Sequence, residues 1–275
     1  DKFESRFRKD SSMFYHYYKA YVYGRELIDT MFLAIRYDIG RKYNSYGLKN
    51  IINQEGMALD GVEYDSTSIR NNYKNPVEWE KIKRYCETDS DYALKLFDLF
   101  SPPFFYLTQS VPKSYQGIIE SASGSQLNAI LMRAYLQDMH SIPKASFKPK
   151  FEGAISFGET GVYKYALKFD IQSLYPSIIL NYNVCDREKD PQGYYLEMTQ
   201  YFTEERLNNK RLAKETNDPY YQYIEQSQKI LINSFFGLLG STGLNFNDGS
   251  SAEFITRTGR EILQKVIKYT TGKDF

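Results

Sequence analysis

The sequence predicts a mixed α/β fold, of the α+β kind, with more than one structural unit. Three observations lead to this prediction. The chain has 275 residues, which is enough to bury a large core and to form several units. Apolar residues recur at helical spacing in several long stretches, whereas residues 163–170 alternate between two sets of side chains as a strand does. The prolines of "SPPFF" (101–105) mark a candidate boundary.

The first hundred residues contain two predicted helices. "LIDTMFLAIRYDI" (27–39) has an apolar face made of Leu27, Met31, Ala34 and Ile35. Residues 1–23 show no clean period, and 44–76 are rich in turn formers. From 76 to 100 the helical period returns, with Trp79, Ile82, Cys86, Ala93 and Phe97 on one face. The following "SPPFF" is expected to end this helix, because neither proline can donate a backbone hydrogen bond.

The run "YCETDS" (85–90) inside the second helix has two interpretations, a helix or a strand–turn–strand hairpin. A hairpin requires alternating β-branched residues around a turn former. The flanks here, "WEKIKR" and "YALKLFDLF", are good helix formers. The helix is therefore favoured, and it places Tyr85 and Asp89 four positions apart, beside the apolar stripe.

The second half is expected to contain a helix at about 125–139 and a strand that ends at Asp170. "SLYPSIIL" then predicts a helix with Ser173 as its N-cap and Pro176 in its first turn. A helical hairpin follows. Its first helix is expected to begin at Thr203, its turn to lie at "TNDP" (216–219), and its second helix to span about 220–236 before Gly237 and Gly240.

Composition sets broad limits on function. The net charge is only +1, so the total charge implies no polyanionic partner, and any basic site must come from local clustering. The two cysteines are far apart in the sequence and predict a reduced, intracellular protein. No apolar run has the length of a membrane span, and the charged start is not that of a signal peptide.

The run "DIQSLYPSII" (170–179) is the most informative for chemistry. A carboxylate at the end of a strand can bind Mg²⁺, which prefers oxygen ligands and retains substrate phosphates. The turn after Asp170 exposes N–H groups at a helix N-terminus, which suits a triphosphate, and Tyr175 could lie under a sugar ring. The alternative is a strand–helix corner with a solvated aspartate, and an isolated D-x-x-S pattern favours that alternative.

Three cations on the helical hairpin could bind a polyphosphate. Arg206 and Lys210 share one stripe of the first helix, and Lys229 projects from the second. The alternative is a solvated charged face, since acidic residues balance the cations of residues 204–229. On charge alone, the solvated face is favoured.

Together, these segments resemble the family B DNA polymerases. "DIQSLYPSII" resembles motif A of the family, and "KILINSFFG" (229–237) resembles motif B, K-x3-N-S-x-Y-G, with Phe236 in place of the tyrosine. "FEGA" (151–154) is similar to the Y-x-G-G/A element, with Phe151 in place of the tyrosine, and "AEFITRTGREIL" (252–263) to the palm segment after motif B. "GRELIDT" (24–30) and "YCETD" (85–89) resemble the end of the proofreading domain. The matches follow the order of the family.

The resemblance implies a domain organisation. Residues 1–105 would be the C-terminal part of a ribonuclease H-like 3′–5′ exonuclease domain, and 106–150 a helical connector. Residues 151–198 would form the first part of the polymerase palm, 199–240 the fingers hairpin, and 241–275 an incomplete second part of the palm.

The resemblance also implies roles for residues of a polymerase site. Asp170 would bind two catalytic Mg²⁺ ions, with the Ile171 carbonyl as a further ligand, and Tyr175 would exclude a ribose 2′-OH. Asn233 would lie near the nascent base pair. The remaining contacts to the incoming triphosphate would come from the backbone N–H groups of Ser173 and Leu174 and from the side chains of Arg206, Lys210 and Lys229.

The exonuclease site would contain Asp89 as a ligand of Mg²⁺ or Mn²⁺ and Tyr85 to orient the attacking water. Asp29 is interpreted as structural. The family's third polymerase motif and the upstream exonuclease carboxylates are not found in this sequence. We therefore expect an interior piece of a longer polymerase that is inactive alone. The short interval between Asp170 and Lys229 lacks the insertions of protein-primed members, which favours a nucleic-acid-primed enzyme of phage, viral or archaeal type.

The implied function is template-directed DNA synthesis from dNTPs, with linked proofreading in the complete protein. The implied partners are primer–template DNA, dNTPs and a sliding clamp or other replication proteins, and the catalytic chain is expected to be monomeric. An alternative hypothesis is a catalytically inactive polymerase-like module that binds nucleic acid or acts as a replisome scaffold.

Overall fold

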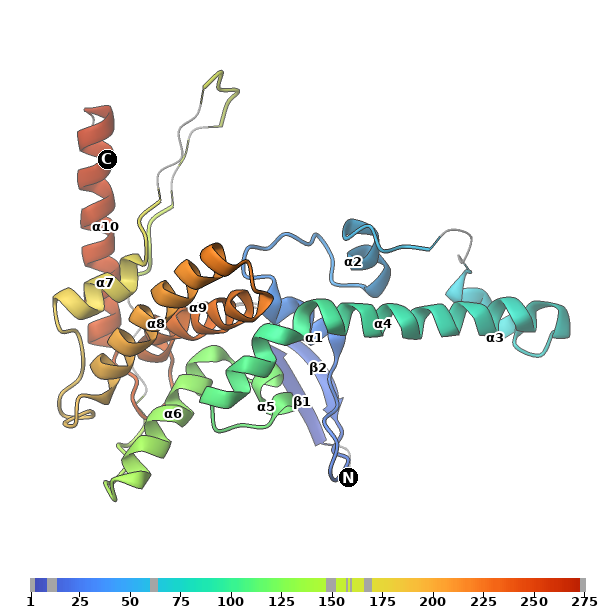
Figure 1. Ribbon diagram of the computed structural model, residues 1–275, viewed down its shortest axis with the longest axis horizontal. Helices are drawn as coiled ribbons and strands as arrows, with labels where there is room; N and C mark the ends of the chain where they lie inside the picture. Colours follow the sequence, from blue (N-terminus) through green and yellow to red (C-terminus); the bar gives the residue numbers. More distant parts are fainter. Residues whose placement is uncertain are drawn as a thin grey trace. The chain divides into compact units, whose positions relative to one another are not determined.

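The computed structural model describes residues 3–8, 14–59, 64–146, 152–156, 158, 160–165 and 170–272. The chain forms two compact units (Figure 1). The first comprises Asp1–Phe105 and Ser114–Glu120, and the second Tyr106–Lys113 and Ser121–Phe275. Within the described ranges the structure is mainly helical and contains one two-stranded sheet. None of the helices in these ranges combines the length and the apolar character that a membrane span requires.

The sheet of the first unit is an antiparallel hairpin of β1 (Phe3–Arg8) and β2 (Phe14–Lys19). It packs on α1 (Thr30–Tyr37) through Phe7, whose ring stacks on Phe32 at a centroid distance of 4.0 Å. The sequence did not reveal these strands, because "FYHYYK" has aromatic residues on both faces and so lacks the apolar–polar alternation of a half-buried strand.

Helix α1 begins at Thr30, three residues later than predicted, so Leu27 lies outside it. Asp29 accepts a hydrogen bond from the Met31 N–H at 2.8 Å and caps the helix, which confirms its structural role. The next short helices are α2 (Leu48–Gln54), the 3-10 turn η1 (Ser66–Ser68) and α3 (Ile69–Asn72). They lie in the stretch for which the sequence predicted only turns.

The longest helix, α4, spans Pro76–Ser110 and includes residues 85–90, which confirms the helical interpretation of "YCETDS". Its buried positions in the first unit differ from the predicted face, since Trp79 and Cys86 are exposed. Ile82 is buried as predicted, and the other buried hydrophobic side chains here are Tyr85, Tyr92, Leu96, Phe100 and Phe104. The predicted face left out the tyrosines. A tyrosine ring can be buried while its hydroxyl keeps a hydrogen-bond partner. The Tyr92 hydroxyl, for example, accepts a hydrogen bond from the Leu59 N–H at 2.8 Å.

The prediction that "SPPFF" ends this helix is wrong, because Pro102 and Pro103 lie inside α4. An internal proline costs about 3 kcal/mol or more through its missing N–H and its ring. Phe100 and Phe104, on either side of the prolines, are 0% and 2% exposed. Burial of each such ring returns roughly 1.5–3 kcal/mol, so tertiary packing can offset the local cost.

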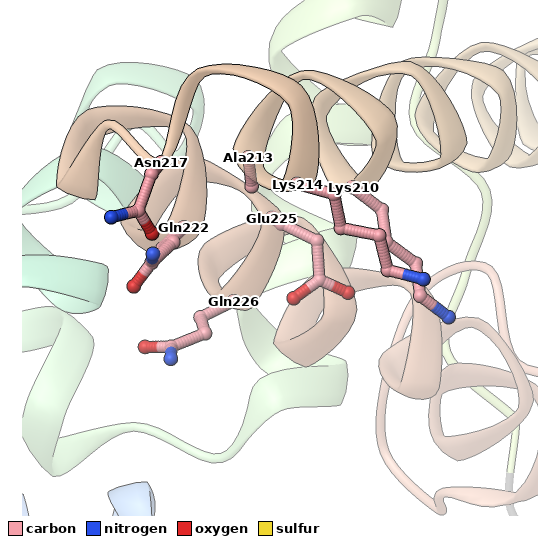
Figure 2. A pocket seen from close by; sticks show the side chains of 7 residues that line it. All are labelled: Lys210, Ala213, Lys214, Asn217, Gln222, Glu225 and Gln226. Carbon is pink, nitrogen blue, oxygen red and sulfur yellow. The ribbon is translucent and has the colours of Figure 1, made fainter.

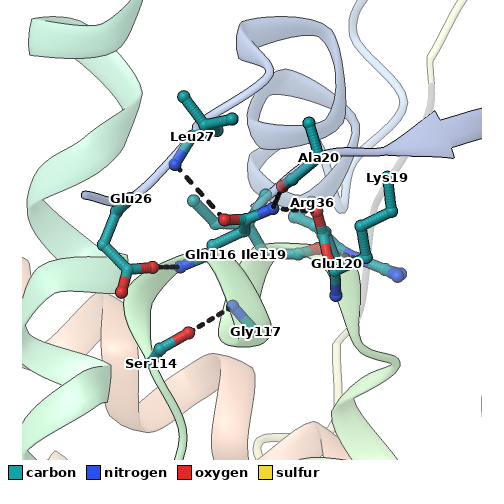
Figure 3. Close-up of polar contacts among 10 residues, drawn as sticks. All are labelled: Lys19, Ala20, Glu26, Leu27, Arg36, Ser114, Gln116, Gly117, Ile119 and Glu120. Atoms are coloured by element: carbon teal, nitrogen blue, oxygen red, sulfur yellow. Dashed lines mark hydrogen bonds and ion pairs between the residues drawn. The ribbon is translucent and has the colours of Figure 1, made fainter. Parts of the chain in front are cut away.

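Helix α5 (Tyr115–Glu120) belongs to the first unit, although the end of α4, which precedes it in the chain, belongs to the second (Figure 3). Gln116, which is buried, makes most of the connections shown. Its N–H donates to the Glu26 carboxylate at 2.7 Å, and its side-chain carbonyl accepts from the Leu27 N–H at 3.3 Å. The Arg36 side chain also donates to the Ile119 carbonyl at 3.1 Å. These contacts attach residues 114–120 to the first unit.

The second unit is helical throughout its described elements. It contains the last turn of α4 followed by α6 (Ser123–Gln137), α7 (Leu174–Asn181), α8 (Tyr194–Thr216), α9 (Pro219–Gly240) and α10 (Gly249–Thr271). Helices α8 and α9 form an antiparallel hairpin. Asn217 adopts a left-handed conformation after α8, and the Asp218 carboxylate caps α9 by accepting from the Tyr220 N–H at 2.9 Å. This confirms the turn predicted at 216–219.

The predicted start of α8 at Thr203 is wrong. The Thr203 hydroxyl donates to the Thr199 carbonyl at 2.6 Å, so Thr203 lies inside the helix. The true start is held by buried Asp190, which accepts from the Tyr195 N–H at 2.8 Å and from the Tyr135 hydroxyl at 2.6 Å. Burial and the hydrogen bond to Asp190 raise the pKa of Tyr135, so its hydroxyl remains a donor.

Helix α9 continues through Gly237 and ends at Gly240, so Gly237 does not terminate it as predicted. Phe235 and Leu238, on either side of Gly237, are buried, and their packing offsets the low helix propensity of glycine.

The strand predicted before Asp170 is not found in the described part of that stretch. Residues 160–165 are irregular, and the side chains of Val162 and Tyr165 are 104% and 84% exposed. Residues 166–169 lie outside the described residues. A strand needs a neighbour for its backbone hydrogen bonds. The only strands described, β1 and β2, pair with each other in the other unit. The predicted strand is therefore not found among the described residues.

Candidate active sites

The loop before α7 presents Asp170, whose side chain is exposed, followed by Ile171. Ser173 precedes the first helical residue in a left-handed conformation (φ 53°, ψ 44°), and its side chain makes no capping hydrogen bond. Ser173 is therefore at the N-cap position, as predicted, but its side chain does not cap the helix. The Ser173 carbonyl still accepts the first helical hydrogen bond, from the Ser177 N–H. The N–H groups of the first turn have no helical acceptor, and a left-handed residue beside them favours anion binding.

Tyr175, in the first turn of α7, contacts two other helices of the second unit. Its ring lies 4.8 Å from that of Phe236 on α9, centroid to centroid, with the planes inclined by 48°. It also faces Gly259 on α10, where an added Cβ would lie 3.4 Å from Tyr175 Cε1. The run 170–179 and the run 229–237, distant in sequence, thus meet at one pair of aromatic rings.

The candidate cations differ in their surroundings. The Arg206 Nε donates to the Glu225 carboxylate at 2.8 Å, and this ion pair links α8 to α9 with side chains only 15% and 17% exposed. Lys210 lines a cavity of about 350 Å³ on the hairpin together with Lys214 and Glu225 (Figure 2). Lys229 and Asn233 are exposed on successive turns of α9. In this conformation Arg206 is therefore already paired with the carboxylate of Glu225.

In the first unit, Tyr85 and Asp89 lie on successive turns of α4, as predicted. The Asp89 Oδ1 atom is buried and makes no hydrogen bond. The ammonium of Lys49, on α2, lies 3.9 Å from this oxygen and 3.8 Å from the centre of the Tyr85 ring. A buried carboxylate oxygen without a hydrogen bond is a position where a cation can bind.

Sequence reasoning missed Lys49. It lies some forty positions before Asp89, and nothing in "GLKNIINQ" distinguishes it from a solvated lysine. Its position is visible only once α2 and α4 are placed together in three dimensions.

The segments 152–154 and 252–263 also meet. The Thr256 hydroxyl donates to the Glu152 carbonyl at 2.8 Å, and the Arg260 guanidinium pairs with the Glu152 carboxylate at 3.1 Å. Phe151, the first residue of "FEGA", lies outside the described residues.

The described residues contain no group of three or more histidine, cysteine, aspartate or glutamate side chains that could hold a metal ion. The donors that are present, the Asp170 carboxylate and the Ile171 carbonyl, are oxygen atoms of the kind that Mg²⁺ prefers. The residues present therefore fit part of a magnesium site.

No family model matches the chain. A DNA polymerase of Thermococcus sp. (strain 9oN-7) is 26% identical over 221 residues, which are 69% of this chain and 28% of the relative. The DNA polymerase alpha catalytic subunit of Arabidopsis thaliana is 33% identical over 132 residues, which are 42% of this chain and 9% of the relative.

A solved structure shares the fold. The family B DNA polymerase of Pyrobaculum calidifontis matches 91% of this chain with a TM-score of 0.74 and 20% sequence identity, over 37% of its own chain. The chain is thus similar in sequence to DNA polymerases, and its fold is that of a family B DNA polymerase. It spans less than a third of the length of the curated relatives that it matches.

Proposed function

We propose that the protein containing this chain is a template-directed DNA polymerase with a linked 3′–5′ proofreading exonuclease. The observation that best supports the polymerase is the contact of Tyr175 with Phe236, because it joins the two segments that resemble motifs A and B. The relatives named as DNA polymerases support the same class of reaction. The substrates would be dNTPs and primer–template DNA.

In the proposed synthesis reaction, Asp170 and the Ile171 carbonyl would hold magnesium. Bound Mg²⁺ would activate the primer 3′-OH and stabilise the leaving pyrophosphate. The first-turn N–H groups at Ser173 and Leu174 would donate to phosphate oxygens of the nucleotide. The ring of Tyr175 would occupy the space of a ribose 2′-OH.

The cations of the hairpin would neutralise the charge that develops on the triphosphate. Lys210 and Lys229 are exposed and can reach a ligand in solvent. Arg206 is paired with Glu225, so it would have to exchange this carboxylate for phosphate oxygens when the nucleotide binds. Such an exchange would couple nucleotide binding to a movement of α8 against α9.

In the proposed exonuclease reaction, the Asp89 Oδ1 atom would be a metal ligand and the Tyr85 hydroxyl would orient water. The Lys49 ammonium adds a positive charge beside both residues. Lys49 would therefore stabilise negative charge on the phosphate being cleaved.

Tyr175→Ala is expected to increase the use of ribonucleotides relative to deoxyribonucleotides by about 10- to 100-fold, because the ring that excludes the 2′-OH is removed. The measurement is single-nucleotide incorporation with matched dNTP and rNTP in the full-length protein. Tyr182→Ala is the control, since Tyr182 follows the last turn of α7 and contacts Phe254 instead. Equal sugar discrimination in Tyr175→Ala and wild type would remove the proposed role of the ring.

Lys210→Ala is expected to raise the KM for dNTPs about tenfold, because one charge-assisted contact to a phosphate is lost. Lys214→Ala is the matched control, because Lys214 lies one turn further along α8 and lines the same cavity (Figure 2). The KM for dNTPs in this control should stay within about twofold of wild type. Similar KM values in the two variants would show that Lys210 makes no specific phosphate contact.

A further inference from the structure

We propose that Gly259 positions the ring of Tyr175 and thereby sets the sugar selectivity of the nucleotide site. This inference rests on the proposed role of Tyr175 in excluding the 2′-OH. Gly259 itself would not touch the nucleotide. It would act through the tyrosine ring, as a positioning residue.

The backbone does not explain a glycine at this position. Gly259 lies in the middle of α10, where alanine has the higher helix propensity. It is also buried, so the reason for glycine must be the space that its missing side chain leaves. An added Cβ would lie 3.4 Å from Tyr175 Cε1 and 3.8 Å from both Ile178 Cδ1 and Leu174 Cδ2. Tyr175 is the neighbour that a larger residue would meet first.

The ring of Tyr175 is bounded on two sides. Gly259 lies along one edge, and the ring of Phe236 lies 4.8 Å away, centroid to centroid. A side chain larger than alanine at position 259 would therefore push the tyrosine out of the place that these two neighbours define.

Helix α10 is fixed near Gly259, which limits its ability to move away. Thr256 and Arg260, on either side of Gly259 in the helix, both bond to residue 152. The Arg260 guanidinium also pairs with the Glu152 carboxylate at 3.1 Å. Because these contacts hold the helix, the ring of Tyr175 is the part that must yield.

The size of the substituted side chain should therefore decide the effect. An alanine Cβ at 3.4 Å from the ring is at ordinary van der Waals distance, so Gly259→Ala should change the dNTP-to-rNTP selectivity by less than about threefold. Valine extends about 1.5 Å further and overlaps the ring. Gly259→Val should lower the selectivity for deoxyribonucleotides about tenfold.

The test measures kcat/KM for a dNTP and for the matching rNTP in the full-length protein, with Gly259→Ala, Gly259→Val and a control. The control is Ala252→Val, which adds volume at another fully buried position of α10 that precedes Gly259 by about two turns. Its selectivity should equal that of wild type. Gly259→Ser, whose hydroxyl also extends beyond Cβ, decides the test if the valine variant does not fold, with an expected loss of about threefold.

Two outcomes would overturn the inference. One is unchanged selectivity in the valine variant, or in the serine variant if the valine variant does not fold, while Tyr175→Ala shows the expected loss. The proposed role of Tyr175 would then still stand. The other is an equal loss in Ala252→Val, which would indicate a general effect of overpacking α10. In a Tyr175→Ala background, Gly259→Val should have no further effect on selectivity, because the ring is absent. If Tyr175→Ala itself leaves selectivity unchanged, it is the proposed function of the tyrosine that fails.

Discussion

Asp170→Ala is expected to abolish nucleotide incorporation, with a loss of at least about 10³-fold in rate, while primer–template binding persists. Asp170 is the one carboxylate in the run 170–179 and is exposed next to the first turn of α7. Without it, the site would lose the carboxylate that we propose both magnesium ions share. Binding of DNA should survive, because that binding depends on many contacts to the phosphate backbone.

Primer extension and a DNA-binding titration on the full-length protein would measure this result. Glu188→Gln is a suitable control, since Glu188 is an exposed acidic residue of the same unit without a proposed role. Normal extension by Asp170→Ala would refute the assignment of the metal site. If the wild-type protein bound DNA but incorporated no nucleotide, the hypothesis of an inactive polymerase-like module would be favoured.

Asp89→Asn is expected to reduce 3′–5′ degradation of single-stranded DNA by about 10³-fold and to leave nucleotide incorporation unchanged. The amide keeps the shape of the carboxylate but loses its charge, so the buried Oδ1 position can no longer hold a divalent cation. The loss should be specific, because Asp89 and Asp170 belong to different compact units.

Digestion of an end-labelled oligonucleotide, with and without dNTPs, separates the two activities. Glu87→Gln provides the control, because Glu87 is an exposed carboxylate of the same helix two residues before Asp89. Undiminished digestion by Asp89→Asn would show that α4 contributes no metal ligand.

The sequence predicted the helices well where local pattern and packing agree. The turn at 216–219 and the helix around "YCETDS" were correct, because capping residues and helix formers mark them directly. The predictions failed where burial outweighs local preference. Pro102 and Pro103 remain inside α4, and Gly237 remains inside α9, since buried aromatic and leucine side chains flank them.

The candidate sites were predictable only in part, for a similar reason. Motif residues such as Asp170 and Tyr85 are recognisable in a short window of sequence. The pairing of Arg206 with Glu225 and the approach of Lys49 to Asp89 join residues on different helices, and no local pattern encodes them. The proposed role of Gly259 is likewise not encoded locally, because it depends on the Tyr175 ring of another helix.

The chain passes between its two compact units three times, after Phe105, after Lys113 and after Glu120. A single proteolytic cut at any of these points would divide at least one unit between the two fragments. Recombination at a single crossover after Phe105 or after Lys113 would likewise separate Gln116 from its partners Glu26 and Leu27. The two compact units of this chain are thus expected to be inherited and replaced together.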